Sequence, residues 1–274
     1  SAINRSHSVA PPVRVPQVEL HQQSRTTGLN GRQSVGNSIT TEPQSRGGRQ
    51  SATVHTSTTT TTPAERVLVQ TTHCAKRGDK TAQATLGDMY SAGMGVPQDY
   101  KLAMHWYLKA ADQGYREVQH RIGNMYAFGH GVNKNHSKAM EWHLKAAKKG
   151  YPESQDFIGG HYYGVALSFE KAMDWYHRAA YQRHAPSEYH IGLLYNFGRG
   201  VTLDYVEAMV WYMKAAKQMH AESQYRIGFL YQRGQGVARD YVEAEEWYSK
   251  AAFQGNRFAK DALIDLWNLG VFGQ

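Results

Sequence analysis

The chain has 274 residues, a formal net charge of +8 and a mean hydropathy of −0.62, so it has room for one large domain or two small ones and much of it must be solvated. Its single cysteine, Cys74, excludes an internal disulfide and a cysteine-based zinc site, and favours a reducing, cytoplasmic compartment. Because the sequence has no run of about 18 apolar residues, we expect no membrane insertion. The missing initiating methionine leads us to expect a fragment or a processed product.

Residues 1–62 form a compositionally distinct segment, rich in Ser, Thr, Gln, Arg and Gly, that ends in a run of threonines. Six arginines in this segment stand against only Glu19 and Glu42. Its apolar residues follow no period and cannot bury enough surface to offset the entropy lost on ordering. We therefore predict a disordered basic tail.

Two short motifs in the tail leave alternatives open. Arg46-Gly47-Gly48 is a weak RNA-binding motif, and the Arg-Gln-Ser steps at 32–34 and 49–51 are weak targets for a basophilic kinase. An RNA-associated or phosphorylation-regulated protein that acts through its tail is thus the alternative to a function of the rest of the chain, although nucleic acid is not the partner we expect.

From residue 63 onward the sequence repeats with a period of about 36 residues. Five tryptophans are spaced 36, 33, 36 and 36 residues apart, and five glycines, each three residues before a tyrosine, keep the same spacing. A pair of alanines follows each tryptophan. These markers divide the chain into five units: 79–114, 115–150, 151–183, 184–219 and 220–255.

Each unit is predicted to contain two helices, A and B. In the fifth unit, residues 224–232 and 240–252 each place apolar residues on one helical face. Asp240 with Glu243, like Asp204 with Glu207, fits a capping box that starts helix B. Glycines follow helix B in three units, where a left-handed residue ends a helix: Gly114, Gly150 and Gly255.

A single helix pair of this kind cannot bury its apolar stripe, but stacked pairs can. We therefore predict an all-α fold, a right-handed α/α superhelical solenoid of about five 36-residue helix-turn-helix repeats. Residues 63–78 are expected to form an N-terminal capping helix. Residues 256–274 are expected to form a C-terminal one.

The recurring pattern G-x-M-Y…G-x-G-V…D-Y…A-x-x-W-Y-x-K-A-A resembles the Sel-one-like repeat family, which is related to the tetratricopeptide repeats. The best copies are residues 86–114 and 227–255. The resemblance implies a non-catalytic scaffold or adaptor that mediates protein–protein interactions. The third unit departs from the pattern because it is three residues short and lacks the Gly-x-Gly loop, so we predict a tighter turn and an irregular superhelix pitch around residues 164–168.

The Gly-x-Gly loops, such as Gly234-Gln235-Gly236, raise the possibility of a phosphate-binding loop. A phosphate loop occurs once, however, and connects a strand to a helix. Here the loop follows a predicted helix, recurs in four units and changes its middle residue freely. We interpret it as the A–B turn, whose glycines provide positive φ angles.

The fourteen histidines suggest no shared chemistry. His105, His143 and His177 flank the repeat tryptophans at different offsets, so we predict that they are solvated or partly packed. We expect no catalytic, cofactor-binding or metal-binding residues and no cofactor. An enzyme of unknown reaction is a remote alternative.

The variable positions of helix A are the best candidates for binding. In tetratricopeptide-like stacks, the residues three before, one after and five after the helix-A glycine face the concave groove. In the first two units these are Ala84, Asp88, Ala92, His120, Asn124 and Phe128. In the last two they are Tyr189, Leu193, Phe197, Tyr225, Phe229 and Arg233.

The aromatic trios of the last two units would form an apolar groove with a basic end, suited to an amphipathic helix or an extended peptide of a partner protein. Alternatively, these side chains pack between helices or against residues 256–269.

Overall fold

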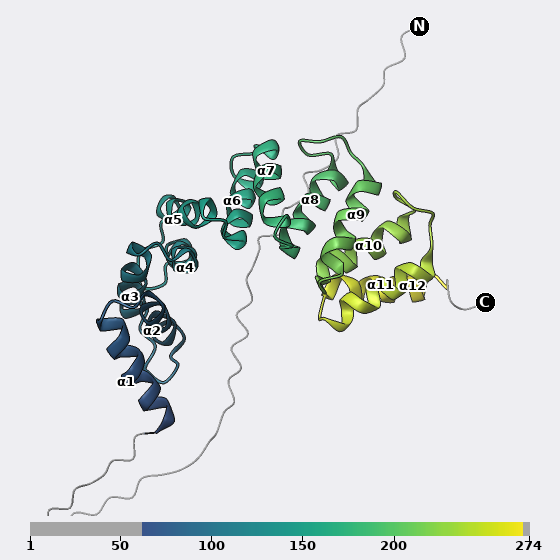
Figure 1. Cartoon of the computed structure of the whole chain (residues 1–274). Coiled ribbons are helices and arrows are strands. Elements are labelled where there is room, and N and C mark those ends of the chain that lie inside the picture. The colour runs from purple at the N-terminus through teal and green to yellow at the C-terminus, as the bar shows by residue number, and fades with distance from the viewer. Residues whose placement is uncertain (1–61, 271–274) are drawn as a thin grey trace, which may run out of the picture. The chain divides into compact units, whose positions relative to one another are not determined.

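The computed structural model describes residues 62–270, which contain twelve helices and no strand (Figure 1). The predicted tail lies outside the described residues. The helices are α1 (Pro63–Lys76), α2 (Lys80–Ala92), α3 (Tyr100–Asp112), α4 (Arg116–Phe128), α5 (His136–Lys148), α6 (Pro152–Gly164), α7 (Phe169–Ala180), α8 (Ala185–Phe197), α9 (Tyr205–Ala216), α10 (Ala221–Arg233), α11 (Tyr241–Phe253) and α12 (Arg257–Asn268).

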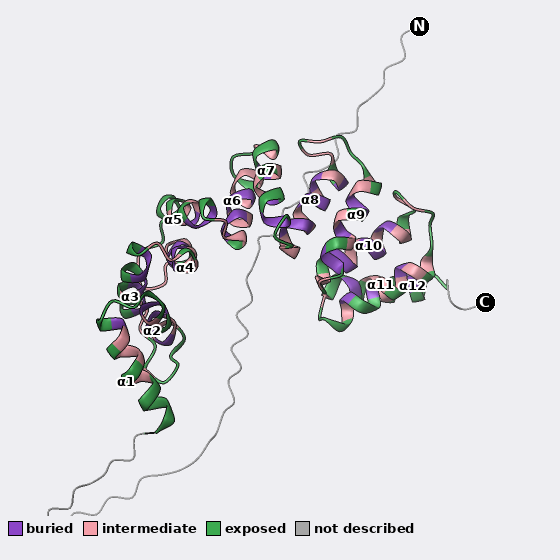
Figure 2. Cartoon of the chain, viewed as in Figure 1, coloured by how far each residue is buried: buried purple, intermediate pink, exposed green. Residues whose placement is uncertain are grey.

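The helices pack in chain order, which confirms the predicted α/α solenoid. Each A helix, from α2 to α10, packs most extensively on the B helix that follows it, and each B helix then packs on the next A helix. Buried residues lie along the helices where they pack together (purple ribbon in Figure 2). The hydrophobic core is therefore a row of small clusters, each of which joins helices of neighbouring units.

The recurring helix-A glycine allows helix B to approach closely. A Cβ atom on Gly192 would lie 2.5 Å from the ring of Tyr212, and the corresponding atom on Gly228 would lie 2.7 Å from the ring of Tyr248. Both tyrosines are fully buried. Only a residue without a side chain fits here, so the spacing of the glycines follows from core packing.

In the second repeat, His143 occupies this aromatic position and packs on Gly123. The prediction that His143 is solvated or partly packed is wrong, because the side chain is fully buried and stacks on Phe157 at 3.8 Å. His105 and His177, by contrast, are exposed.

The Gly-x-Gly loops are A–B turns, as predicted. In the fifth repeat the φ angles are 65° at Gly234 and 73° at Gly236. A Cβ atom on Gly236 would also lie 2.7 Å from the Tyr205 carbonyl carbon of the preceding repeat. The second glycine of the loop thus also permits close contact between repeats.

The third repeat has the tighter turn that its sequence predicts. Only residues 165–168 connect α6 and α7, and Leu167 has a φ of 49° without being glycine. Val165, in the right-handed region, takes the place of the left-handed glycine that ends the other A helices. The irregular pitch stays a prediction.

Asp204 and Asp240 cap their helices as predicted, and each carboxylate accepts from two backbone N–H groups. The capping-box roles of Glu207 and Glu243 are wrong, because the N–H groups of Asp204 and Asp240 donate to the Tyr195 and Tyr231 carbonyls instead. Glu207 Oε1 accepts a hydrogen bond from Trp211 Nε1 at 3.0 Å. Glu207 and Trp211 are four residues apart in the same helix, which places their side chains next to each other on one face.

Helix B ends at a left-handed residue in every repeat. Gly114, Gly150 and Gly255 have φ angles between 79° and 91°, which confirms their predicted role. In the third and fourth repeats the same position is held by Arg183 and Met219, with φ angles of 59° and 62°. These two residues adopt a conformation that L-amino acids disfavour.

A ladder of glutamines, not foreseen from the sequence, joins successive repeats. Gln224 donates to the Ala216 carbonyl at the end of the preceding helix, and Gln254 in turn donates to Gln224 Oε1 at 2.7 Å. Lys149 replaces the second glutamine in the second repeat and bonds to Gly114 instead. The Oε1 atom of Gln119 is consequently buried without a donor.

The terminal helices α1 and α12 pack on α2 and α11, respectively. Their role as caps stays a prediction. The outward side of α12 exposes Ile264 and Trp267, which is more apolar than the outer face of a typical terminal repeat.

Candidate binding surface

The six residues predicted to line a groove all lie on α8 and α10, the A helices of the last two repeats. Phe197 and Arg233, at the ends of these helices, are exposed. The other four are half-buried: Tyr189, Leu193, Tyr225 and Phe229.

Most of these residues form one continuous set of contacts. The Arg226 guanidinium, which was not predicted, lies 5.9 Å from the ring centroid of Phe197 and 5.8 Å from that of Tyr225. The Tyr225 and Phe229 rings are 6.4 Å apart, and Arg233 lies 5.1 Å from the Phe229 ring. The two helices therefore present a single surface of aromatic rings and arginines.

Arg199, in the middle of a Gly-x-Gly loop, extends this surface. Its guanidinium lies 5.6 Å from the Phe197 ring and donates to the Tyr163 hydroxyl of the preceding repeat. We call the six predicted residues, together with Arg199 and Arg226, the arginine–aromatic face. The signal for both missed arginines was a basic residue at a variable position of the repeat.

Part of the face also serves the core. Tyr189 and Leu193 pack against the buried cluster between α9 and α10, and the Tyr225 ring lies 6.0 Å from Phe258 on α12. Packing between helices and against residues 256–269, the alternative left open by the sequence, thus accounts for the inner parts of these side chains. The exposed residues of the face are Phe197 and Arg233, whereas Arg199 and Arg226 are half-buried.

The arginines of the arginine–aromatic face have no acidic partner among the described residues. Within residues 62–270, no carboxylate forms an ion pair with Arg199, Arg226 or Arg233. The Nε atom of Arg226 is shielded from solvent and has no hydrogen-bond acceptor in this part of the chain. Among the described residues, the positive charge of the face is therefore not neutralised.

The equivalent positions in the first two repeats are more polar. Asp88, Ala92 and Asn124 line a shallow, open hollow, together with Tyr107 and Arg121. Asp88 forms an ion pair with Arg121 and accepts a hydrogen bond from the Tyr107 hydroxyl at 2.7 Å. Burial, aided by Asp88, raises the pKa of Tyr107 to about 12.

The remaining predicted positions of these two repeats differ in exposure. Ala84 is buried, His120 is half-buried and Phe128 is exposed. The His120 Nε2 atom lies 2.9 Å from the amide nitrogen of Asn124. Only Phe128 resembles the aromatic residues of the last two repeats.

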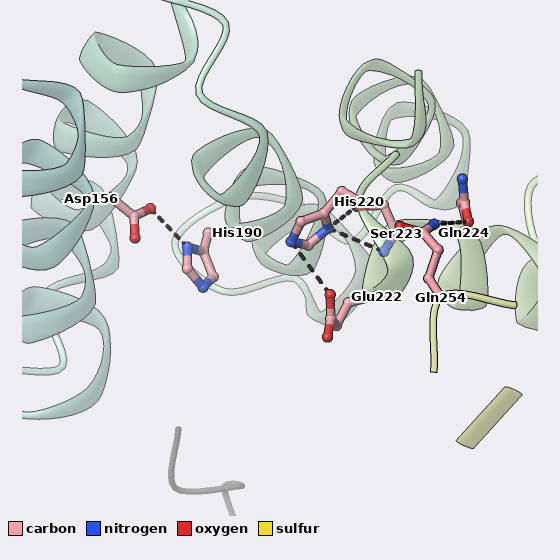
Figure 3. A network of polar contacts seen from close by, with 7 residues as sticks. All are labelled: Asp156, His190, His220, Glu222, Ser223, Gln224 and Gln254. Carbon is pink, nitrogen blue, oxygen red and sulfur yellow. Dashed lines mark hydrogen bonds and ion pairs between the residues drawn. The ribbon is translucent and has the colours of Figure 1, made fainter. Parts of the chain in front are cut away.

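A polar network between the third and fourth repeats was not predicted. Asp156 lies 3.0 Å from His190 Nδ1 and accepts a hydrogen bond from Ser187 at 2.6 Å (Figure 3 shows the Asp156–His190 contact). Burial opposes ionisation of Asp156, but His190 and these hydrogen bonds hold the pKa of its carboxyl below the usual value. The carboxylate is thus stabilised as an anion.

Although serine, histidine and aspartate meet here, they are not arranged as a catalytic triad. In a triad the histidine lies between the nucleophilic serine and the aspartate. Here Ser187 lies between His184 and Asp156, and its side chain is fully buried. The arrangement supports packing between repeats rather than nucleophilic attack on a substrate.

Two further junctions hold histidines in the same way. Ser154 lies 3.0 Å from His120 and 3.2 Å from His143, and burial lowers the pKa of these histidines to about 4 and about 3. His220 contacts Ser223 and Glu222 at the junction of the last two repeats (Figure 3). Buried histidines at these junctions are therefore neutral near pH 7.

The described residues contain no group of three or more His, Cys, Asp or Glu side chains placed to hold a metal ion. Within the same range, no helix is long and apolar enough to cross a membrane.

The stack of α/α repeats with a variable helix-A surface defines a helical-repeat protein of the solenoid class. The model of the Sel1 repeat matches residues 81–115, 116–151, 152–184, 185–220 and 221–256, and the chain therefore belongs to the Sel1 repeat family. A comparison with curated proteins found no match.

Two solved structures are similar in both sequence and fold. A Sel1 repeat protein from Oxalobacter formigenes has a TM-score of 0.71 and 30% identity, over 77% of this chain and 86% of that one. The protein c5321, a protective antigen of uropathogenic Escherichia coli strains, has a TM-score of 0.69 and 35% identity, over 74% of this chain. This chain spans only 44% of the length of c5321.

The immunity protein PA5088 from Pseudomonas aeruginosa shares the fold alone. Its TM-score is 0.53 at 20% identity, over 73% of this chain and 77% of that one.

Proposed function

We propose that this chain is a non-catalytic scaffold that binds a segment of a partner protein through the arginine–aromatic face. The observation that carries the proposal is the continuous contact from Phe197 through Arg226 and Tyr225 to Phe229 and Arg233. Aromatic and arginine side chains are the residue types that most often dominate the energy of protein–protein interfaces.

The choice of residues at these positions supports a role in binding. The repeat fold requires the glycine and the alanine pair of every unit, but it holds Ala84, His120 or Asp156 where Tyr189 and Tyr225 stand. Aromatic residues are therefore not needed there for packing alone. A surface that differs between repeats on a shared framework is typical of solenoids that recognise other proteins.

The enzyme and the tail-mediated functions have less support than binding of a partner protein. The cluster of Ser187, His184 and Asp156 does not support the enzyme alternative, because the Ser187 side chain is fully buried. Association of the basic tail with RNA, its regulation by phosphorylation and a reducing, cytoplasmic compartment stay predictions from the sequence. Steeply salt-dependent RNA binding that disappears on deletion of residues 1–62 is the observation that would favour the tail.

The proposal is tested by affinity capture with the full-length chain and with the double variant Leu193→Asp/Phe229→Asp. Two carboxylates on the face should abolish capture of any partner that binds there, because apolar contacts are replaced by charges that need solvation. The matched control is Val206→Asp/Val242→Asp, which places the same charges at exposed positions of α9 and α11.

We expect the control to retain the captured partner and both variants to keep their helical circular dichroism. Capture that survives the Leu193→Asp/Phe229→Asp change in a folded chain would show that the face is not the binding surface.

A further inference from the structure

The first two repeats show how an arginine of helix A is neutralised inside the solenoid. Arg121 stands two residues before its repeat glycine, and Asp88 stands one residue after the glycine of the preceding repeat. These positions bring the two side chains into an ion pair between adjacent A helices. Tyr107 completes the set by donating to the same carboxylate.

Arg226 has the same position in the fifth repeat as Arg121 has in the second. The residue that corresponds to Asp88, one after the glycine of the preceding repeat, is Leu193. The framework therefore places an arginine at the position where an acid would meet it, but supplies an apolar side chain instead. The Arg226 Nε atom is buried without an acceptor among the described residues, and the guanidinium hydrogen-bonds to Tyr189 rather than to a carboxylate.

The two other arginines of the face share this lack of a carboxylate. Within residues 62–270, the Arg199 guanidinium lies against the aromatic groups of Tyr163, Phe169 and Phe197 and pairs with no carboxylate. Arg233 lies over the Phe229 ring. An arginine stacked on an aromatic ring is held in place and keeps its N–H groups available for bidentate bonds to a carboxylate.

We infer that the arginine–aromatic face takes an acidic segment of a partner protein, a peptide with Asp or Glu carboxylates for the arginines and apolar side chains for the rings. One carboxylate of this segment would meet Arg226 as Asp88 meets Arg121. The inference rests on the proposed function and specifies the chemistry of the partner. The charge of residues 1–62, six arginines against two glutamates, makes this chain's own tail a poor occupant.

The test is a selection of random 12-residue peptides displayed on phage against the full-length chain. Enriched peptides should be rich in Asp and Glu and should contain apolar residues. An enriched peptide is then synthesised together with a version in which Asn and Gln replace Asp and Glu. The acidic peptide should bind at least tenfold more tightly, and the difference should shrink as salt is added.

Arg226→Leu should weaken binding of the acidic peptide about tenfold and leave the neutral peptide unaffected. Arg121→Leu is the matched control, since it removes the same charge from the same repeat position where Asp88 already neutralises it. We expect this control to bind the acidic peptide like the unchanged chain. Circular dichroism and a thermal midpoint verify that both variants are folded.

The failures of the two proposals are distinguishable. Peptides that bind without enrichment of acids, and that are lost with Leu193→Asp/Phe229→Asp but not with Arg226→Leu, would overturn the inference and leave the proposed function standing. Binding that ignores all three substitutions would overturn both. Self-association of the full-length chain that the double variant abolishes, with no acidic peptide enriched, would assign the face to a second copy of the chain and also overturn the inference.

Discussion

The first two repeats (α2 to α5) and the last two (α8 to α11) have the same framework but differ in whether a helix-A arginine pairs with an acidic residue. In both regions an arginine precedes the helix-A glycine by two residues. Arg121 is neutralised by Asp88, whereas Leu193 holds the position that corresponds to Asp88 in the late repeats and Arg226 lies among aromatic rings. The comparison teaches that the repeat pattern determines packing, while the variable positions determine which charges are left for a partner.

The comparison assumes that all repeats share one packing framework. A substitution that disrupts this packing should have the largest effect on stability. Gly159→Ala should lower the free energy of unfolding by about 3 kcal/mol, because the new Cβ atom would lie 2.6 Å from the buried Tyr176 ring. Gly160→Ala, one residue later in α6, is the matched control. Its Cβ atom would lie 3.9 Å from the Tyr176 hydroxyl, so alanine should be neutral or stabilising by up to about 1 kcal/mol.

Chemical denaturation of the two variants measures both changes. Equal losses of stability would mean that close packing against helix B does not explain the glycine.

The second expected effect is a dependence on pH that distinguishes the early repeats from the late ones. His143 occupies the position that Tyr212 and Tyr248 hold in the late repeats, and burial lowers its pKa to about 3. In the unfolded chain His143 binds a proton near pH 6.5, but in the folded chain it does not. The contribution of neutral His143 to stability is therefore fully present above this pH and is lost as the pH falls toward the folded pKa. At pH 5 this one group should cost about 2 kcal/mol.

His143→Tyr should remove this share of the acid sensitivity, which is measured by denaturation at pH 7.5 and pH 5. His105→Tyr is the matched control, since it makes the same substitution at an exposed position. An unchanged loss of stability in the His143→Tyr variant would contradict the assignment.

A smaller effect is expected where the late repeats depart from the early ones at the end of helix B. Met219 has a φ of 62° at the position that Gly114 and Gly150 hold in the first two repeats. Met219→Gly should relieve this strain and stabilise the chain by about 1 kcal/mol, as judged by its denaturation midpoint. Loss of stability in this variant would show that side-chain contacts of Met219 outweigh the backbone strain.

The smallest effect concerns the glutamine ladder, in which Lys149 replaces the second glutamine of the second repeat. Lys149→Gln should supply the donor that the buried Gln119 Oε1 atom lacks and stabilise the chain by about 0.5 kcal/mol. Lys148→Gln, at the exposed neighbouring position, should have no effect. Equal changes in the thermal midpoints of the two variants would mean that the ladder does not contribute.

The helix-turn-helix framework could be predicted from the sequence because its requirements recur in every repeat. Glycines opposite aromatic rings and aspartates at helix starts leave a periodic signal that does not depend on distant contacts. Residues whose role depends on a neighbouring repeat left no such signal. Arg226 and Arg199 became meaningful only when adjacent helices brought them to Phe197, and His143 was misjudged because the equivalence of its position to that of Tyr212 was overlooked.

The most direct test of the acidic-partner account compares Leu193→Asp with Leu193→Asn in binding the selected acidic peptide. The aspartate should neutralise Arg226 from within, as Asp88 neutralises Arg121, whereas asparagine has nearly the same shape and no charge. The account predicts that Leu193→Asp weakens binding at least tenfold more than Leu193→Asn does, measured by isothermal titration calorimetry at low salt. Equal affinities of the two variants for the acidic peptide would contradict it.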